Sequence, residues 1–178
     1  MEIALVEAYL VSRTADQHVQ ARLDEVEALM RRATALDPAD ACCFRARLAD
    51  QRAHALNRLG TDEGYRRALA LYEALPADDV HPFASYRRDA GLAYGYLRAG
   101  RLDEALAAAR RACEHAGDGG YVRLRVMGLL MQAKILTRAD TSEVLGRAQA
   151  IAARLEDQEL LLRVARARDL PPRRLPSE

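Results

Sequence analysis

The sequence contains little of what β structure requires. Its 178 residues include 10 glycines and 6 prolines, and β-branched residues never alternate with polar ones over a useful length. Period-two alternation is the usual mark of a half-buried strand, so its absence argues against strands. Alanine, leucine, arginine and glutamate dominate instead, and these are strong helix formers. We therefore predict an all-α protein, and the length suits one domain.

The chain also lacks long apolar runs and a plausible set of disulfides. No apolar run reaches the roughly 18 residues of a membrane-spanning helix, and the opening segment MEIALVEAYLV carries Glu7 and has no basic flank, unlike a signal peptide. Three cysteines, Cys42, Cys43 and Cys113, make a poor disulfide framework because their number is odd and two are adjacent. We expect reduced thiols, no membrane partner and a cytoplasmic location.

An excess of charge of either sign is absent as well. Lysine and arginine total 27 and aspartate and glutamate total 26, which gives a formal net charge of +1. A balanced charge provides no overall electrostatic attraction to nucleic acid or to an anionic membrane. Nucleic acid is therefore not an expected partner.

No constellation of catalytic residues is present in the sequence. There is no phosphate-binding glycine loop and no nucleophile elbow, and the glycine-rich turn at 117–120 follows an expected helix rather than a strand. Cys43 lies between Cys42 and Phe44, which favours an inert buried thiol over a reactive one. We predict no enzymatic activity, no cofactor and no metal site, because no histidine has a partner at metal-ligand spacing: His18, His54, His81 and His115.

The segment from Gly91 to Ala112 has the pattern of two amphipathic helices separated by Gly100. Gly91 and Gly95 fall inside the first of these helices, where each costs about 1 kcal/mol relative to alanine. Such a cost is tolerated where another backbone must come close. The pattern therefore predicts an αα-hairpin whose two helices approach each other tightly through small residues.

The same pattern of two helices separated by a turn recurs along the chain, with turns near residues 60, 100 and 140. A period of about 40 residues in helix pairs predicts an α-solenoid of stacked antiparallel pairs. We expect about four pairs plus a C-terminal capping helix in a domain spanning 1–170, followed by a disordered tail at 171–178. The expected helices cover about 2–13, 15–36, 39–59, 62–75, 83–99, 101–116, 120–138, 141–156 and 157–169.

The central repeat resembles the tetratricopeptide repeat (TPR) family. Ala93, Ala105 and Ala112 occupy the places where that family has small residues, and Leu92 and Tyr96 occupy places of large apolar ones. The resemblance covers about residues 2–156, with one strong copy and three degenerate copies. It implies a right-handed superhelix that serves as a scaffold for binding other proteins.

In TPR proteins the first helices of successive repeats line a concave groove. The resemblance implies that the groove binds a protein or peptide, and its cations would suit an acidic one. The residues that it places there are called below the predicted groove residues: Arg47, Asp50, His54, Asn57, Arg58, Arg87, Tyr94, Leu97, Arg98 and Lys134.

Two alternatives to an adaptor remain open from the sequence. Bacterial transcription regulators carry helical-repeat modules of this kind, and a cluster of arginines near the C-terminus could contact nucleic acid: Arg163, Arg166, Arg168, Arg173 and Arg174. The apolar first helix, from Ile3 to Val11, could instead pair with a second copy and produce a homo-oligomer.

Overall fold

A computed structural model describes residues 19–32, 37–77, 81–136 and 138–169 of the chain. Within these ranges it contains eight α-helices and no strand, which confirms the all-α prediction. The expected first helix (2–13) and the expected tail (171–178) lie outside the described residues. The helices are α2 Val19–Arg32, α3 Pro38–Arg58, α4 Asp62–Glu73, α5 Pro82–Arg98, α6 Leu102–Asp118, α7 Val122–Ile135, α8 Arg138–Arg154 and α9 Gln158–Asp169.

Local sequence signals set several of the helix ends. The side chains of Asp37 and Thr61 accept hydrogen bonds from backbone amides in the first turns of α3 and α4, at 2.8 and 3.1 Å. Gly60 and Gly100 have positive φ angles of 67° and 76°, which glycine adopts without strain. The turn expected at Asp140 is wrongly placed, because α7 ends at Ile135 and α8 already begins at Arg138.

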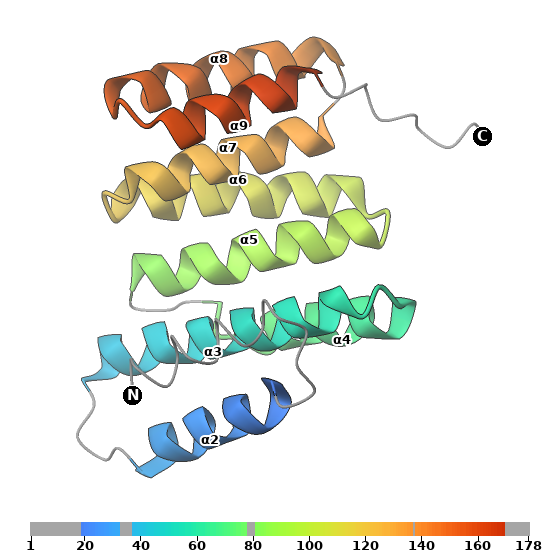
Figure 1. Ribbon diagram of the computed structural model, residues 1–178, viewed down its shortest axis with the longest axis vertical. Coiled ribbons are helices and arrows are strands. Elements are labelled where there is room, and N and C mark those ends of the chain that lie inside the picture. Colours follow the sequence, from blue (N-terminus) through green and yellow to red (C-terminus); the bar gives the residue numbers. More distant parts are fainter. Residues whose placement is uncertain (1–18, 33–36, 78–80, 137, 170–178) are drawn as a thin grey trace.

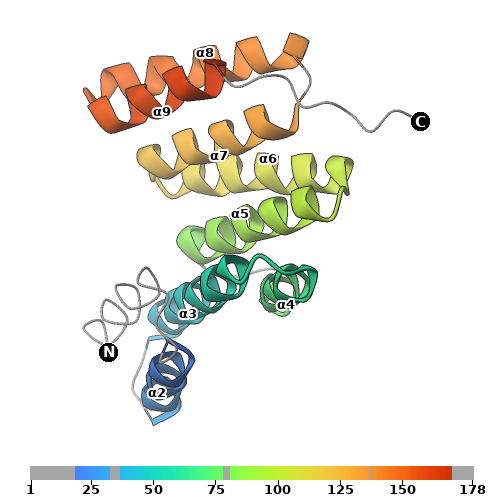
Figure 2. The same cartoon turned by 45° about the vertical axis from the view of Figure 1, so that its right-hand side comes forward.

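The helices are arranged in two rows. Figures 1 and 2 show α3, α5, α7 and α9, which we call the front row, along one side of the molecule, with α4, α6 and α8, the back row, behind them. Neighbouring helices within the front row contact each other, and each back-row helix contacts the two front-row helices beside it. Among the described residues the back-row helices do not pack on one another, and α2 packs on α3.

Small residues fill the core in the middle of the molecule. Ala53, Ala93 and Ala105 are fully buried and belong to one cluster with Leu92 and Tyr72, which joins α3, α4, α5 and α6. Burial of alanines allows helix axes to approach closely. A second cluster holds α7, α8 and α9 together with larger side chains, including Val126, Leu129, Leu145, Leu160 and Val164.

The two glycines inside α5 have a different neighbour from the one predicted. A Cβ atom on Gly91 would lie 2.2 Å from the ring of Tyr72, and one on Gly95 would lie 2.6 Å from Leu69 Cδ1. Both neighbours are side chains of α4. The prediction that these glycines admit the backbone of α6 is therefore wrong, because they make room for side chains of the preceding pair.

Candidate binding surface

The described predicted groove residues all lie on front-row helices: five on α3, four on α5 and Lys134 on α7. Two of them are in direct contact. Arg87 Nη1 donates a hydrogen bond to Asp50 Oδ2 at 2.8 Å, and this ion pair joins α3 to α5. Tyr72 of α4 donates its hydroxyl proton to the other carboxylate oxygen at 2.9 Å. Asp50 is therefore occupied by partners within the chain.

Burial is the main cause that raises the pKa of the Tyr72 phenol, and the negative charge of Asp50 adds to it. The phenol therefore stays protonated and keeps donating to Asp50 at any ordinary pH. Arg87 has a second neighbour, because its guanidinium carbon lies 5.2 Å from the centre of the Phe83 ring. These contacts fix Arg87 in place on the front row.

Arg98 has its stacking partner in the back row. Its guanidinium carbon lies 4.0 Å from the centre of the Tyr65 ring, and Tyr65 belongs to α4 in the back row. The side chain therefore contacts the row opposite to the one that the prediction assigned to it. The reason is helical spacing, since Arg98 lies on the same stripe of α5 as Gly91 and Gly95, and this stripe faces α4.

The other predicted groove residues differ in how far they reach into solvent. Four of them are exposed: His54, Arg58, Tyr94 and Lys134. Tyr94, which is 36% exposed, is one of the few large apolar residues on the described surface. The remaining three are half-buried: Arg47, Asn57 and Leu97. The front row thus presents an aromatic ring, cations and an amide, which are groups that peptides and proteins can contact.

An aromatic group that the sequence analysis did not identify lies where α5 and α7 begin. The rings of Phe83 and Tyr121 are 5.8 Å apart in an edge-on arrangement, and His81 lies 6.5 Å from Tyr121. His81 is the N-cap of α5, and its Nδ1 accepts a hydrogen bond from the Phe83 amide at 3.2 Å. In the sequence, a histidine directly before Pro82 could have indicated this N-cap, because proline favours the first position of a helix.

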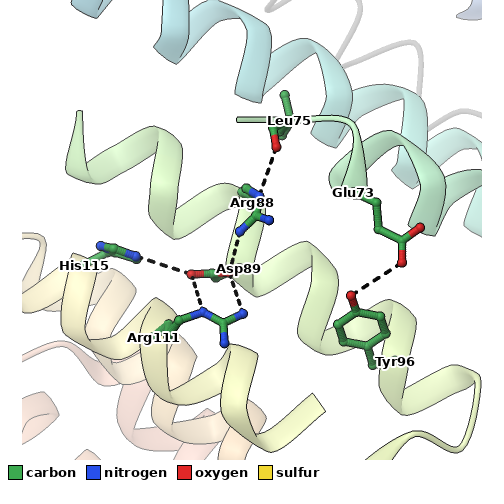
Figure 3. Close-up of polar contacts among 7 residues, drawn as sticks. All are labelled: Glu73, Leu75, Arg88, Asp89, Tyr96, Arg111 and His115. Atoms are coloured by element: carbon green, nitrogen blue, oxygen red, sulfur yellow. Dashed lines mark hydrogen bonds and ion pairs between the residues drawn. The ribbon is translucent and has the colours of Figure 1, made fainter. Parts of the chain in front are cut away.

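A buried carboxylate is the strongest polar feature of the interior, and the sequence analysis missed it. Asp89 on α5 is 2% exposed, and Figure 3 shows it between two helices. Arg111 of α6 donates to both of its oxygens, at 3.0 and 3.2 Å, and Arg88 donates at 3.2 Å. His115 Nε2 of α6 lies 3.3 Å from Oδ2. Burial of a charge is tolerated when it is paired in this way.

The same network reaches α4. The Nε of Arg88 donates to the backbone carbonyl of Leu75 at 3.1 Å, just beyond the end of α4 (Figure 3). A separate hydrogen bond, donated by Tyr96 to Glu73 at 3.4 Å, also joins α5 to α4 (Figure 3). Asp89 and its partners therefore tie together the end of α4, the middle of α5 and the second half of α6. Each of its polar contacts is made within the chain, so we assign this network to stability.

No metal-binding group of three or more histidine, cysteine, aspartate or glutamate residues occurs among the described residues. None of the three cysteines forms a disulfide: Cys42 and Cys113 are buried, and Cys43 is half-buried. Burial raises the pKa of Cys113 to about 11, so this thiol is a poor nucleophile at neutral pH. In the same part of the chain no helix is long and apolar enough to cross a membrane.

Three hollows in the described part of the surface are lined by none of the predicted groove residues. One, of about 530 Å³, is bounded by α2, α3 and α4, and its Arg52 is already paired with Asp24 at 2.6 Å and with Glu27 at 2.7 Å. Two others adjoin each other between α6, α7 and α8 and are described below.

The structure also places part of the C-terminal arginine cluster. Arg163 of α9 donates to Glu159 at 2.6 and 3.1 Å, and Arg123 of α7 lies 3.0 Å from Asp157. Arg163 is thus paired with a carboxylate, whereas Arg166 and Arg168, also on α9, are exposed. Arg173 and Arg174, and the segment 3–11 expected to mediate self-assembly, lie outside the described residues.

Comparison of the chain with protein-family models, with curated proteins and with solved structures finds no match.

Proposed function

We propose that this chain is a TPR-like α-solenoid that acts as a non-enzymatic adaptor and binds a protein or peptide on its front row. The regular contacts support this assignment, because each back-row helix packs between two successive front-row helices. Stacked helix pairs of this kind expose a continuous row of first helices, which is the binding surface of many repeat proteins.

One observation carries the proposal. The front row brings together residues that are far apart in the sequence and leaves the Tyr94 ring exposed on its α5 helix. His54 of α3 and Lys134 of α7 are exposed on the two front-row helices that contact α5. Aromatic side chains with polar neighbours dominate the energetics of protein interfaces. A partner that contacts all three helices would bury this ring.

The test is affinity capture from a lysate of cells that naturally produce the protein, quantified by mass spectrometry. We choose the double variant Tyr94→Ala/Lys134→Glu because neither side chain forms an ion pair among the described residues. Arg87 is unsuitable, since its loss would break the ion pair with Asp50 and mix instability with lost binding.

The matched control is Arg66→Glu on α4, an exposed charge reversal in the back row. We expect a captured protein that wild type and control retain and the double variant loses. Retention of the same proteins by all three chains would refute binding on the front row. Circular dichroism melts of the three chains verify that the substitutions leave the fold intact.

A further inference from the structure

A long groove opens on the back row, on the side opposite the predicted groove residues. The back-row helices α6 and α8 do not pack on each other, and no two of their described Cα atoms lie within 8 Å. Two hollows of about 190 and 520 Å³ occupy this gap and share Gly117 and Arg125 in their linings. We call the two together the back groove. Helix α7 forms its floor, with Gln132 and the neighbouring Cys113 of α6 buried there.

Four arginines line the back groove: Arg110 of α6, Arg125 of α7, and Arg147 and Arg154 of α8. All four are exposed, and within the described part of the chain none forms an ion pair with a carboxylate. Arg111, one residue along α6 from Arg110, is by contrast bound to Asp89. The groove therefore concentrates cations whose charge the fold itself does not use.

Two carboxylates, Glu114 and Asp118 of α6, also line the wider hollow. Neither forms an ion pair with any of the four arginines in the described structure. Four cations against two carboxylates leave the groove with an excess of positive charge. A guanidinium pairs preferentially with carboxylate oxygens, which fit its planar fork.

The narrower end of the groove holds its exposed apolar side chains, next to Arg154 and the shared Arg125. Val122 and Leu155, with side chains 40% and 42% exposed, line it together with Ile151. Only six large hydrophobic residues are exposed in the described structure, and two of them meet here. A ligand for the whole groove therefore needs an apolar group at one end and an anionic group at the other.

The length of the groove selects among such ligands. It follows α6 from Arg110 to Asp118, a rise of about 12 Å at 1.5 Å per residue. An extended peptide advances about 3.3 Å per residue, so four or five residues span this distance. A single small anion would reach the arginines and leave Val122 and Leu155 uncovered.

We propose that the back groove binds a short extended segment of a partner protein that carries an apolar side chain at one end and acidic side chains at the other. The apolar side chain lies against Val122, Ile151 and Leu155, and the carboxylates pair with Arg125 and Arg147. The floor of the groove contacts the segment but provides no charged group. The Gln132 amide nitrogen already donates to the Ala109 carbonyl at 3.3 Å and to Cys113 Sγ at 3.1 Å.

The test uses NMR titration of the isotope-labelled full chain with synthetic peptides. Two probes cover both directions of binding: acetyl-Leu-Ala-Glu-Ala-Glu-amide and acetyl-Glu-Ala-Glu-Ala-Leu-amide. Each has a matched control in which glutamine replaces both glutamates. We expect one of the two acidic probes to shift the resonances of Gly117, Arg125 and Leu155, and the glutamine peptides to shift them far less.

A double variant, Arg125→Gln/Arg147→Gln, removes the two cations and should weaken binding about fivefold or more, as the loss of two exposed charge pairs implies. The control Arg45→Gln/Arg66→Gln changes two exposed arginines outside the groove and should bind as wild type does. The front-row variant Tyr94→Ala/Lys134→Glu should also bind normally, which separates this proposal from the adaptor proposal.

Three results of the peptide titrations would overturn the inference. These are no shifts with either acidic probe at millimolar concentration, equal shifts with the glutamine peptides, and unchanged binding by Arg125→Gln/Arg147→Gln. Shifts at the same groove residues when the unliganded protein is concentrated would identify a second copy as the occupant and would equally overturn it.

Discussion

The same substitution, glycine to alanine, should have opposite effects at two helical positions of this protein. Gly91 in α5 and Gly146 in α8 both lie inside helices, where alanine is favoured over glycine by about 1 kcal/mol. Around Gly146 no atom lies within 4 Å of the Cβ that alanine would add. Gly146→Ala should therefore raise the free energy of unfolding by roughly 0.5–1 kcal/mol.

At Gly91 the added Cβ would lie 2.2–2.3 Å from three carbon atoms of the Tyr72 ring. The ring cannot move away cheaply, because it is 6% exposed and its hydroxyl is bonded to Asp50 at 2.9 Å. Overpacking of this kind costs about 1–3 kcal/mol and more when a buried hydrogen bond is also broken. After the gain in helix propensity, Gly91→Ala should still lower the free energy of unfolding by about 1–2 kcal/mol.

Urea denaturation followed by circular dichroism measures both changes, and thermal melts should shift by about 2–4 °C per kcal/mol for a chain of this length. A Gly91→Ala/Tyr72→Phe double variant removes the bond to Asp50 and should recover part of the loss, since the ring is then freer to shift. Equal stabilisation by Gly91→Ala and Gly146→Ala would refute the close packing of α4 on α5.

Two further predictions concern buried polar groups. Asp89→Ala should lower the free energy of unfolding by about 2–3 kcal/mol in urea titration, because the two arginines and the histidine around it lose their common partner. Glu104→Ala removes an exposed carboxylate paired with Arg101 and should change the free energy of unfolding little, so similar losses in the two variants would contradict the structural role of Asp89. Cys113, with its pKa raised to about 11, is about one part in a thousand thiolate at pH 8, against roughly a quarter for an ordinary cysteine. Mass-spectrometric mapping should therefore show its alkylation by iodoacetamide to be at least 100-fold slower in the folded chain than in urea, and equal rates would contradict its burial.

The sequence by itself was sufficient to predict the all-α class and most of the helix spans. Composition and the 3.6-residue apolar period depend only on neighbouring residues, so the all-α class and the spans of α3 to α6 agree with prediction to within about two residues. Caps are equally local, and Gly60 and Gly100 end their helices where expected. The misplaced turn near Asp140 has no glycine or proline to mark it.

The tertiary structure decided which helices these residues meet. Asp50 and Arg87 are 37 residues apart, and both were predicted to face a groove, yet their pairing depends on how α3 lies against α5. Arg98 contacts Tyr65 rather than the front row for the same reason. Asp89 lies on the apolar stripe of α5, but only the position of α6 supplies Arg111 and His115, the partners that allow its burial.

The back groove likewise depends on tertiary structure and could not be predicted from the sequence. Its arginines come from three helices, and each has the ordinary spacing of a solvated helical face. Periodicity identifies the buried side of each helix, because burial follows from apolar residues within one helical stretch. The groove exists because α6 and α8 are held apart by α7, and the distance between two helices is fixed by the side chains packed among all three.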